Sequence, residues 1–160
     1  MNLLIGDKST FAIETSFEHF GTQPFGNVLI WLGDWYVGAY EDPVPLLTFL
    51  SSLKRIPDLD VEANSGFLRS GDAFFDGVMA GTMAGGDKYR LSLGESFDDF
   101  SLLGYRDGGA IRIIWRLHEE PYFQYPSYPR GLQSACVPAE AFAGVVAGFE
   151  AAIGFRPVGS

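Results

Sequence analysis

The sequence is poor in the side chains that most often carry catalysis or bind metals. Cysteine occurs once, as Cys136, and histidine twice, as His19 and His118, in 160 residues. A single cysteine excludes an intrachain disulfide and is compatible with a reducing compartment. Neither histidine has a cysteine or carboxylate at metal-ligand spacing, and no glycine-rich loop has the form that binds phosphate. The sequence therefore predicts neither a metal site nor a cofactor.

Basic residues are also scarce, with 11 Lys and Arg against 20 Asp and Glu and a formal net charge of −9. Phosphate contacts need a basic surface, so the charge argues against direct binding of nucleic acid. An acidic surface attracts a basic partner protein, although solubility alone also explains such a charge. No apolar run approaches the ~20 residues of a membrane span. The start, Met1–Asp7, has no basic segment typical of a signal peptide, so the cytoplasm is the expected location.

The composition does supply a hydrophobic core. Hydrophobic residues make up 47% of the chain and aromatic residues 15%. A chain of this length fits one domain, residues 1–160, which needs no disulfide or metal for stability. The same hydrophobic content is compatible with a homodimer, but nothing in the sequence specifies one.

Two β-hairpins are predicted from alternation and turn residues. Thr10–Glu18 alternates apolar and polar residues with the period of a half-buried strand. A loop marked by glycine and proline is expected to follow, from Phe20 to Gly26. The apolar run Asn27–Leu32 is followed by Gly33 and Asp34, which predict a type II′ turn into a strand over Trp35–Tyr40. A second hairpin is predicted over 97–117, with Asp107 and Gly108 in a type I′ turn and alternate residues, Ile111, Ile113, Trp115 and Leu117, on one face.

Helices are predicted at three places. Asp42 as N-cap and Pro43 at the first helical position begin a helix that runs to Arg55. A short helix is expected over 72–79 and a final one over 138–153. Between 57 and 94 the pattern is weak: Asp58, Asp60 and Glu62 indicate an acidic turn, and a strand is expected at 87–93. The short tail Phe155–Ser160 is expected to be frayed. We expect an α+β fold, a mostly antiparallel sheet of about six or seven strands carrying two or more helices. Its predicted core includes Phe11, Ile13, Phe17, Leu29, Trp31, Leu50, Leu53, Ile113, Trp115, Phe142, Val146 and Phe149.

Catalytic arrangements are not evident. Asp98 and Asp99 are neighbours in sequence, as are Glu119 and Glu120, and neighbours on a strand point to opposite faces. His118 as a general acid or base, or Cys136 as a nucleophile with a distant histidine, are the enzymatic alternatives. A solvated histidine at a strand end and a small buried thiol are the favoured interpretations.

The segment Glu119–Arg130 carries three prolines and four aromatic residues. Proline excludes a central strand or a helix interior, so we expect a long ordered loop before a strand over 131–137. Tyrosines are enriched where proteins bind proteins, and those of this loop, with Tyr36 and Tyr40, are candidate contacts. The alternative is that the rings fold back onto the sheet edge.

Several stretches are similar to an immunity protein family of bacterial polymorphic toxin systems, immunity protein family 42. They are Ile5–Glu14, Trp31–Gly38, Phe97–Phe100, Ile111–Arg116 and the closing strand and helix over 132–153. The resemblance implies a small protein that binds and blocks a cognate toxin and so protects the producing cell and its kin. It brings no catalytic, cofactor or metal-binding residues.

We therefore expect stoichiometric inhibition of a toxin by occlusion, without catalysis. A basic nuclease is one expected identity of the toxin, because an acidic inhibitor would meet it quickly. A non-catalytic adaptor, or a small enzyme using His118 or Cys136, are the alternatives. The toxin contacts expected from charge and aromatic exposure are Glu14, Glu18, Asp34, Tyr36, Tyr40, Asp98, Asp99, Tyr122, Tyr125 and Tyr128.

Overall fold

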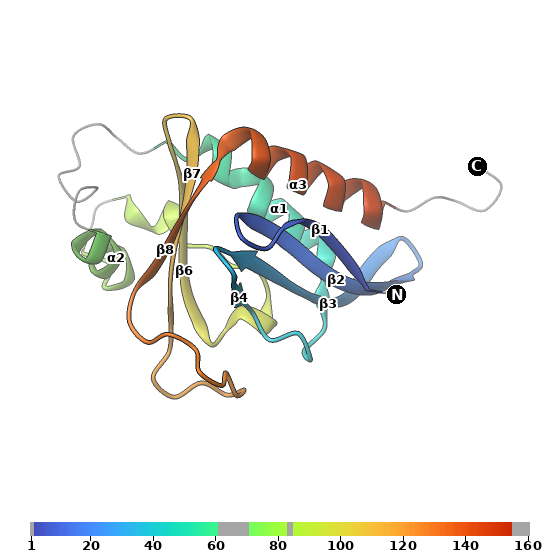
Figure 1. Ribbon diagram of the computed structural model, residues 1–160, viewed down its shortest axis with the longest axis horizontal. Coiled ribbons are helices and arrows are strands. Elements are labelled where there is room, and N and C mark those ends of the chain that lie inside the picture. Colours follow the sequence, from blue (N-terminus) through green and yellow to red (C-terminus); the bar gives the residue numbers. More distant parts are fainter. Residues whose placement is uncertain (1, 61–70, 83–84, 155–160) are drawn as a thin grey trace.

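The computed structural model describes residues 2–60, 71–82 and 85–154 (Figure 1). The acidic turn expected around Glu62 and the tail Phe155–Ser160 lie outside the described residues. The described strands form two antiparallel sheets of five and three strands. With three helices they make the predicted α+β fold.

The first sheet is a meander in which each strand pairs with the next along the chain. Its strands are β1 (Leu3–Asp7), β2 (Phe11–Phe20), β3 (Gln23–Leu32) and β4 (Trp35–Val37). A further short strand, β5 (Val44–Pro45), pairs with the other end of β3, at Phe25 and Gly26.

Two turns of this sheet differ from the sequence predictions. Gly33 and Asp34 both have positive φ, 56° and 72°, which is the geometry of a type I′ turn and not of type II′. The loop expected between Phe20 and Gly26 is instead a tight turn, because Phe20 pairs with Gln23 and Gly21 takes a φ of 67°. Glycine and proline in this stretch suggested a loop, but both strands continue through it.

The end of β4 and the start of the first helix also differ from the prediction. Gly38 has a φ of 118°, and a Cβ there would lie 2.8 Å from the Phe97 ring, so the strand ends at Val37 and not at Tyr40. Val44 then pairs with β3, which delays the helix to Leu46. Asp42 therefore caps nothing, and the helix has no side-chain cap.

The second sheet has the order β6 (Phe100–Asp107), β7 (Ala110–Leu117) and β8 (Gln133–Pro138). Its hairpin turn is shifted by one residue from the prediction, because Asp107 pairs with Ala110 and leaves Gly108 and Gly109 as the central residues. The strand expected at 87–93 is wrong. A 3-10 helix spans Gly86–Tyr89, and an isolated bridge joins Arg90 to Leu103.

Two helices cover one side of the molecule and the third covers the other. α1 (Leu46–Arg55) and α3 (Ala139–Ile153) lie side by side over the first sheet, and α2 (Gly71–Met79) lies against the far face of the second sheet (Figure 1). As predicted, alternate residues of β7 from Ile111 to Leu117 join the main core. Ile114, on the opposite face, joins a second core with α2. Of the predicted core, Phe17 and Trp31 are only half-buried.

Candidate binding site

The aromatic loop, Glu119–Arg130, connects β7 to β8 and folds back beside β4 (Figure 1). Tyr128 is only 6% exposed, and its ring packs against Trp35, Tyr36 and Phe100. Its hydroxyl accepts a hydrogen bond from Trp115 Nε1 at 3.0 Å and donates one to the Tyr36 carbonyl at 2.6 Å. Burial raises the pKa of Tyr128, which stays neutral. The expected exposure of Tyr128 is therefore wrong, because the ring completes the core.

Asp99 holds this loop in place from the start of the second sheet. It is 8% exposed and accepts hydrogen bonds from the backbone N–H groups of Tyr122, at 2.7 Å, and Phe123, at 3.0 Å. The Tyr125 hydroxyl donates a third bond, at 2.8 Å. Burial acts to raise the pKa of Asp99, but these three donors outweigh it and hold the pKa below its ordinary value. The exposure expected of Asp99 is corrected, and its neighbour Asp98 is the exposed member of the pair.

Tyr125 and Tyr122 face different surroundings within the loop. Tyr125 is half-buried and stacks on Tyr36, with ring centroids 6.1 Å apart and planes at 25°. Burial, and then the bond to Asp99, raise its pKa. Tyr122 is 86% exposed, the most exposed large hydrophobic side chain in the described part of the chain. The loop therefore presents Tyr122 to solvent while Tyr125 and Tyr128 anchor it.

A groove of about 300 Å³ opens where β2, β3 and β4 meet the loop. We call it the tyrosine groove, and its lining includes Glu14, Trp31, Tyr36, Tyr40, Glu41 and Tyr125. Four of the predicted contacts, Glu14, Tyr36, Tyr40 and Tyr125, thus come together. Trp31 and Glu41 were missed. The hairpin contained a signal for Trp31, because Trp31 stands directly opposite Tyr36 and so lies on the same face of the sheet.

An acidic pocket of about 570 Å³ adjoins the tyrosine groove through consecutive residues of the chain. It is lined by Asp42, Glu95, Ser96, Asp98, Asp99, Tyr122 and Phe123. Asp42 follows Glu41 of the groove, and Tyr122 and Phe123 lie on the same loop as Tyr125. Three further predicted contacts, Asp98, Asp99 and Tyr122, therefore line this second hollow. Glu18 and Asp34 are exposed and line neither.

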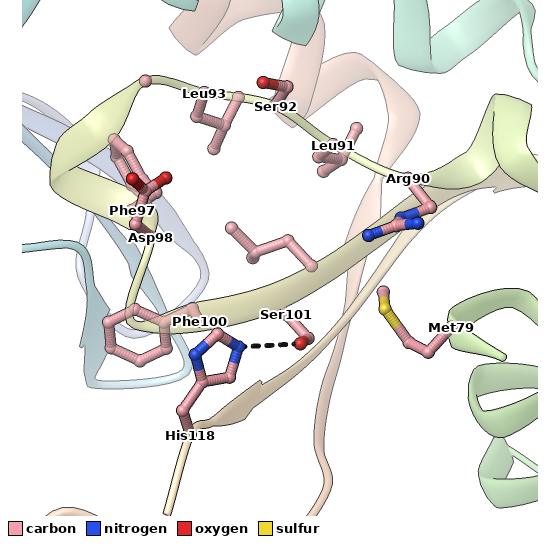
Figure 2. Close-up of a pocket in the computed structure, with 12 residues that line it drawn as sticks. Met79, Arg90, Leu91, Ser92, Leu93, Phe97, Asp98, Phe100, Ser101 and His118 are labelled. Carbon is pink, nitrogen blue, oxygen red and sulfur yellow. Dashed lines mark hydrogen bonds between the residues drawn. The ribbon is translucent and has the colours of Figure 1, made fainter. Parts of the chain in front are cut away.

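The enzymatic alternatives centre on a third pocket, of about 430 Å³, drawn in Figure 2. Here His118 Nε2 lies 2.9 Å from Ser101 Oγ, with Met79 and Arg90 bordering the same hollow. A nucleophile and base of this kind also need a group that orients the imidazole. Within residues 2–60, 71–82 and 85–154, no carboxylate bonds the His118 ring. The pair is a hydroxyl–imidazole contact without the third member of a triad.

Cys136 is exposed on β8, which corrects the buried thiol expected from the sequence. The buried position of this strand end belongs to its neighbour Val137, which faces the main core. Because successive side chains alternate across a strand, Cys136 takes the opposite face, in register with Arg112.

The family model described as immunity protein 42 matches residues 1–152. The chain belongs to the immunity protein 42 family. It is accordingly a toxin-neutralising immunity protein, as the sequence resemblance predicted. Comparison with curated proteins gives no match.

The crystal structure of CdiI from Burkholderia dolosa AUO158 is similar to that of this immunity protein. The TM-score is 0.62 at 17% sequence identity, and the match covers 94% of this chain and 99% of that chain. At this identity the likeness shows a shared fold. Among the helices described, none is long and apolar enough to cross a membrane.

Proposed function

We propose that this immunity protein neutralises its toxin by one-to-one binding without catalysis, and that the tyrosine groove and the acidic pocket form the toxin-binding face. The observation that carries the proposal is the convergence of seven predicted contacts on two adjoining hollows. Half-buried aromatic rings surrounded by polar groups are typical of the residues that dominate binding energy.

The charge of this face points to a basic partner. Glu14 and Glu41 line the groove and Asp42, Glu95 and Asp98 line the acidic pocket, whereas neither lining includes Lys, Arg or His. An acidic face on a chain of net charge −9 accelerates encounter with a basic protein. A basic nuclease fits this description, and the cytoplasm of the protected cell is the place where it would be blocked.

The predicted contacts divide into different roles on this face. Tyr122 is the exposed anchor, and Tyr36 and Tyr40 are the anchors within the groove. Asp99 and Tyr128 act indirectly, because they hold the aromatic loop in its conformation. Glu18 and Asp34 lie outside both hollows and would act as rim charges, which affect the rate of association more than the lifetime of the complex.

Co-expression with the protein encoded by the adjacent gene tests this proposal. We expect one-to-one capture in a pull-down and rescue of growth. Tyr122→Ala should weaken binding by about 2 kcal/mol or more, as for a central anchor. Phe20→Ala is the matched control, because Phe20 is 63% exposed at the β2–β3 turn, away from both hollows. A wild-type protein that neither binds nor rescues contradicts the proposed function.

The His118–Ser101 pair allows catalysis to be tested separately. If inhibition is stoichiometric, Ser101→Ala and His118→Gln should rescue growth as well as the wild type, with full inhibition at one inhibitor per toxin. Substoichiometric inhibition that disappears in both variants would favour an enzymatic mechanism instead.

A further inference from the structure

The structure assigns a ligand to the tyrosine groove: we propose that it receives an arginine side chain of the toxin, with the guanidinium held among aromatic rings and between two carboxylates. This inference rests on the proposed function and specifies the chemistry of the partner at one point. It is carried by the groove's aromatic lining, its charge and a cation already present beside one of its rings.

One carboxylate of the groove is held in a fixed position. Trp31 Nε1 donates a hydrogen bond to Glu14 Oε1 at 3.0 Å, and Asn2 Nδ2 lies 3.4 Å from Oε2. The indole occupies one oxygen, while Oε2 has only the long contact from Asn2, an exposed side chain whose amide oxygen accepts a hydrogen bond from the Tyr40 hydroxyl. Oε2 of Glu14 is therefore available to a charged donor entering the groove.

The rings around this carboxylate are arranged for contact with a flat cation. Tyr36 makes an edge contact with Trp31, at a centroid separation of 5.7 Å and 67°, and stacks with Tyr125 at 6.1 Å and 25°. Aromatic faces attract cations within about 6 Å of the centroid, and more strongly when solvent is displaced. The half-buried groove supplies such faces from several elements at once.

A cation already lies on one of these rings. Lys8 Nζ is 4.2 Å from the centroid of the Trp31 ring. Lys8 is exposed at the β1–β2 turn and outside the groove lining. The ring thus engages an ammonium group even where water competes, and the groove adds the carboxylates of Glu14 and Glu41.

The second carboxylate of the groove lining is that of Glu41. Besides burial, which is the larger cause, the charge of Glu41 raises the pKa of Tyr36, and that of Glu14 raises the pKa of Tyr40. The two acids of the lining therefore act on different tyrosines of the groove. An extended donor that reaches both fits this arrangement better than a point charge does.

Arginine meets these requirements and lysine does not meet all of them. Guanidinium is planar, stacks on aromatic faces and presents five donors in a rigid fork, so it can bond two carboxylates while it lies against a ring. The ammonium of lysine is compact and strongly hydrated, and gains less from a stacked site.

Titration of the isotope-labelled protein with N-acetylarginine amide, followed by NMR at low salt, tests the inference without the toxin. We expect saturable shifts at the Trp31 indole N–H and at the Gly38 and Ala39 amides, which line the groove. The citrulline analogue, which has the same shape without the charge, should produce none. Equal shifts with citrulline, tighter binding of the lysine analogue, or shifts spread over the acidic surface would overturn the proposal.

Two charge-neutralising substitutions complete the test. Glu14→Gln with Glu41→Gln should weaken arginine binding about tenfold, in line with the loss of charge partners beside an aromatic site. The side-chain amide introduced at position 14 keeps an oxygen that can accept the Trp31 bond, so the fold is kept. Glu18→Gln is the matched control, because it removes one charge from the same strand outside the groove. An unchanged affinity in the double variant contradicts the inference.

The toxin separates this inference from the function on which it rests. If the wild type captures the toxin and the double variant captures it equally well, the arginine site is wrong and the immunity function stands. If the wild type fails to capture the toxin at all, the proposed function is wrong, whatever the result with arginine amide.

Discussion

The two faces of the second sheet stabilise their aromatic residues in different ways. On the face toward the aromatic loop, Tyr128 and Tyr125 are fixed by hydrogen bonds to Trp115, the Tyr36 carbonyl and Asp99. On the face toward α2, Phe74 packs against Tyr89 and Tyr105 at centroid separations of 5.5 and 5.3 Å, and the contacts are chiefly between rings.

The difference follows from the segment that packs on each face, which is a helix on one face and an irregular loop on the other. Beyond its first turn, α2 satisfies its backbone N–H groups within the helix, and apolar packing then positions it on the sheet. The aromatic loop has no helical ladder and makes a turn bond from the Tyr128 N–H to the Tyr125 carbonyl at 3.1 Å, so directional side-chain partners are needed to select one conformation for it. The surface proposed to bind the toxin is therefore held by specific polar bonds, while the opposite face depends on packing.

The largest loss of stability is expected from the packed face. Phe74→Ala removes a side chain that is 1% exposed and should lower the free energy of unfolding by about 4 kcal/mol. Urea denaturation measures the change. Because Phe74 lies away from the groove, the variant that remains folded should still bind arginine amide with unchanged affinity, and a loss of binding would break the separation of the two faces.

Asp99→Ala should lower both the free energy of unfolding and toxin binding, whereas Phe74→Ala should lower stability alone. It leaves two backbone N–H groups and the Tyr125 hydroxyl without their acceptor, at a cost of about 3 kcal/mol. Toxin binding should fall with it, because the loop loses its conformation. Asp98→Ala is the matched control in stability, since Asp98 is exposed and should cost less than about 0.5 kcal/mol. Equal stability of the two variants would refute the role given to Asp99.

The hydrogen bonds of the two faces can be compared directly by removing one tyrosine hydroxyl from each. Tyr128→Phe leaves the buried Trp115 N–H and the Tyr36 carbonyl without partners and should cost about 2 kcal/mol. Tyr89→Phe removes only a 3.3 Å bond to the Asp60 carbonyl and should cost about 0.5 kcal/mol. Thermal or urea unfolding of the pair measures the difference, and equal costs would count against it.

The smallest effect is a dependence on pH confined to the loop face. The folded pKa of Asp99 lies below its ordinary value of 3.8, so its contribution to stability is present above that value and is lost as the pH falls through the folded pKa. Asp99→Asn should lack this component in urea midpoints measured at acidic pH. Amide exchange of α2 at those pH values should match in the two proteins, and a common loss of protection would contradict the assignment to Asp99.

Periodicity predicted most of the architecture, because it depends on which face of each element is buried. The alternation in β7 and the stripe on α3 carry that information in the sequence itself. The type of the Gly33–Asp34 turn was missed because Asp34 also takes a positive φ, which its side chain does not indicate. The start of α1 was missed because it depends on a pairing distant in sequence, that of Val44 with Gly26 of β3.

The candidate site was predicted only in part, because only some of its residues have an exposure that is set by their neighbours along the chain. Glu14, Tyr36 and Tyr40 lie on strands or just beyond them, where exposure follows from neighbours along the chain. Asp98 and Asp99 have the same chemistry, and the choice of which is buried is made by the loop at 122–125, which is distant in sequence. Trp31 was assigned to the core from its hydrophobicity, whereas its indole N–H bonds Glu14 at the groove.

The bonds from Asp99 to the main chain have a consequence for how such inhibitors diversify. At positions 122 and 123 the carboxylate recognises only the peptide N–H, which every residue except proline supplies. The hydrogen bonds that shape the loop therefore do not depend on which side chains stand at positions 122 and 123. On the proposed binding face, substitutions at Tyr122 and Phe123 would change the surface offered to the toxin while the loop keeps its conformation, so partner choice and folding could evolve separately.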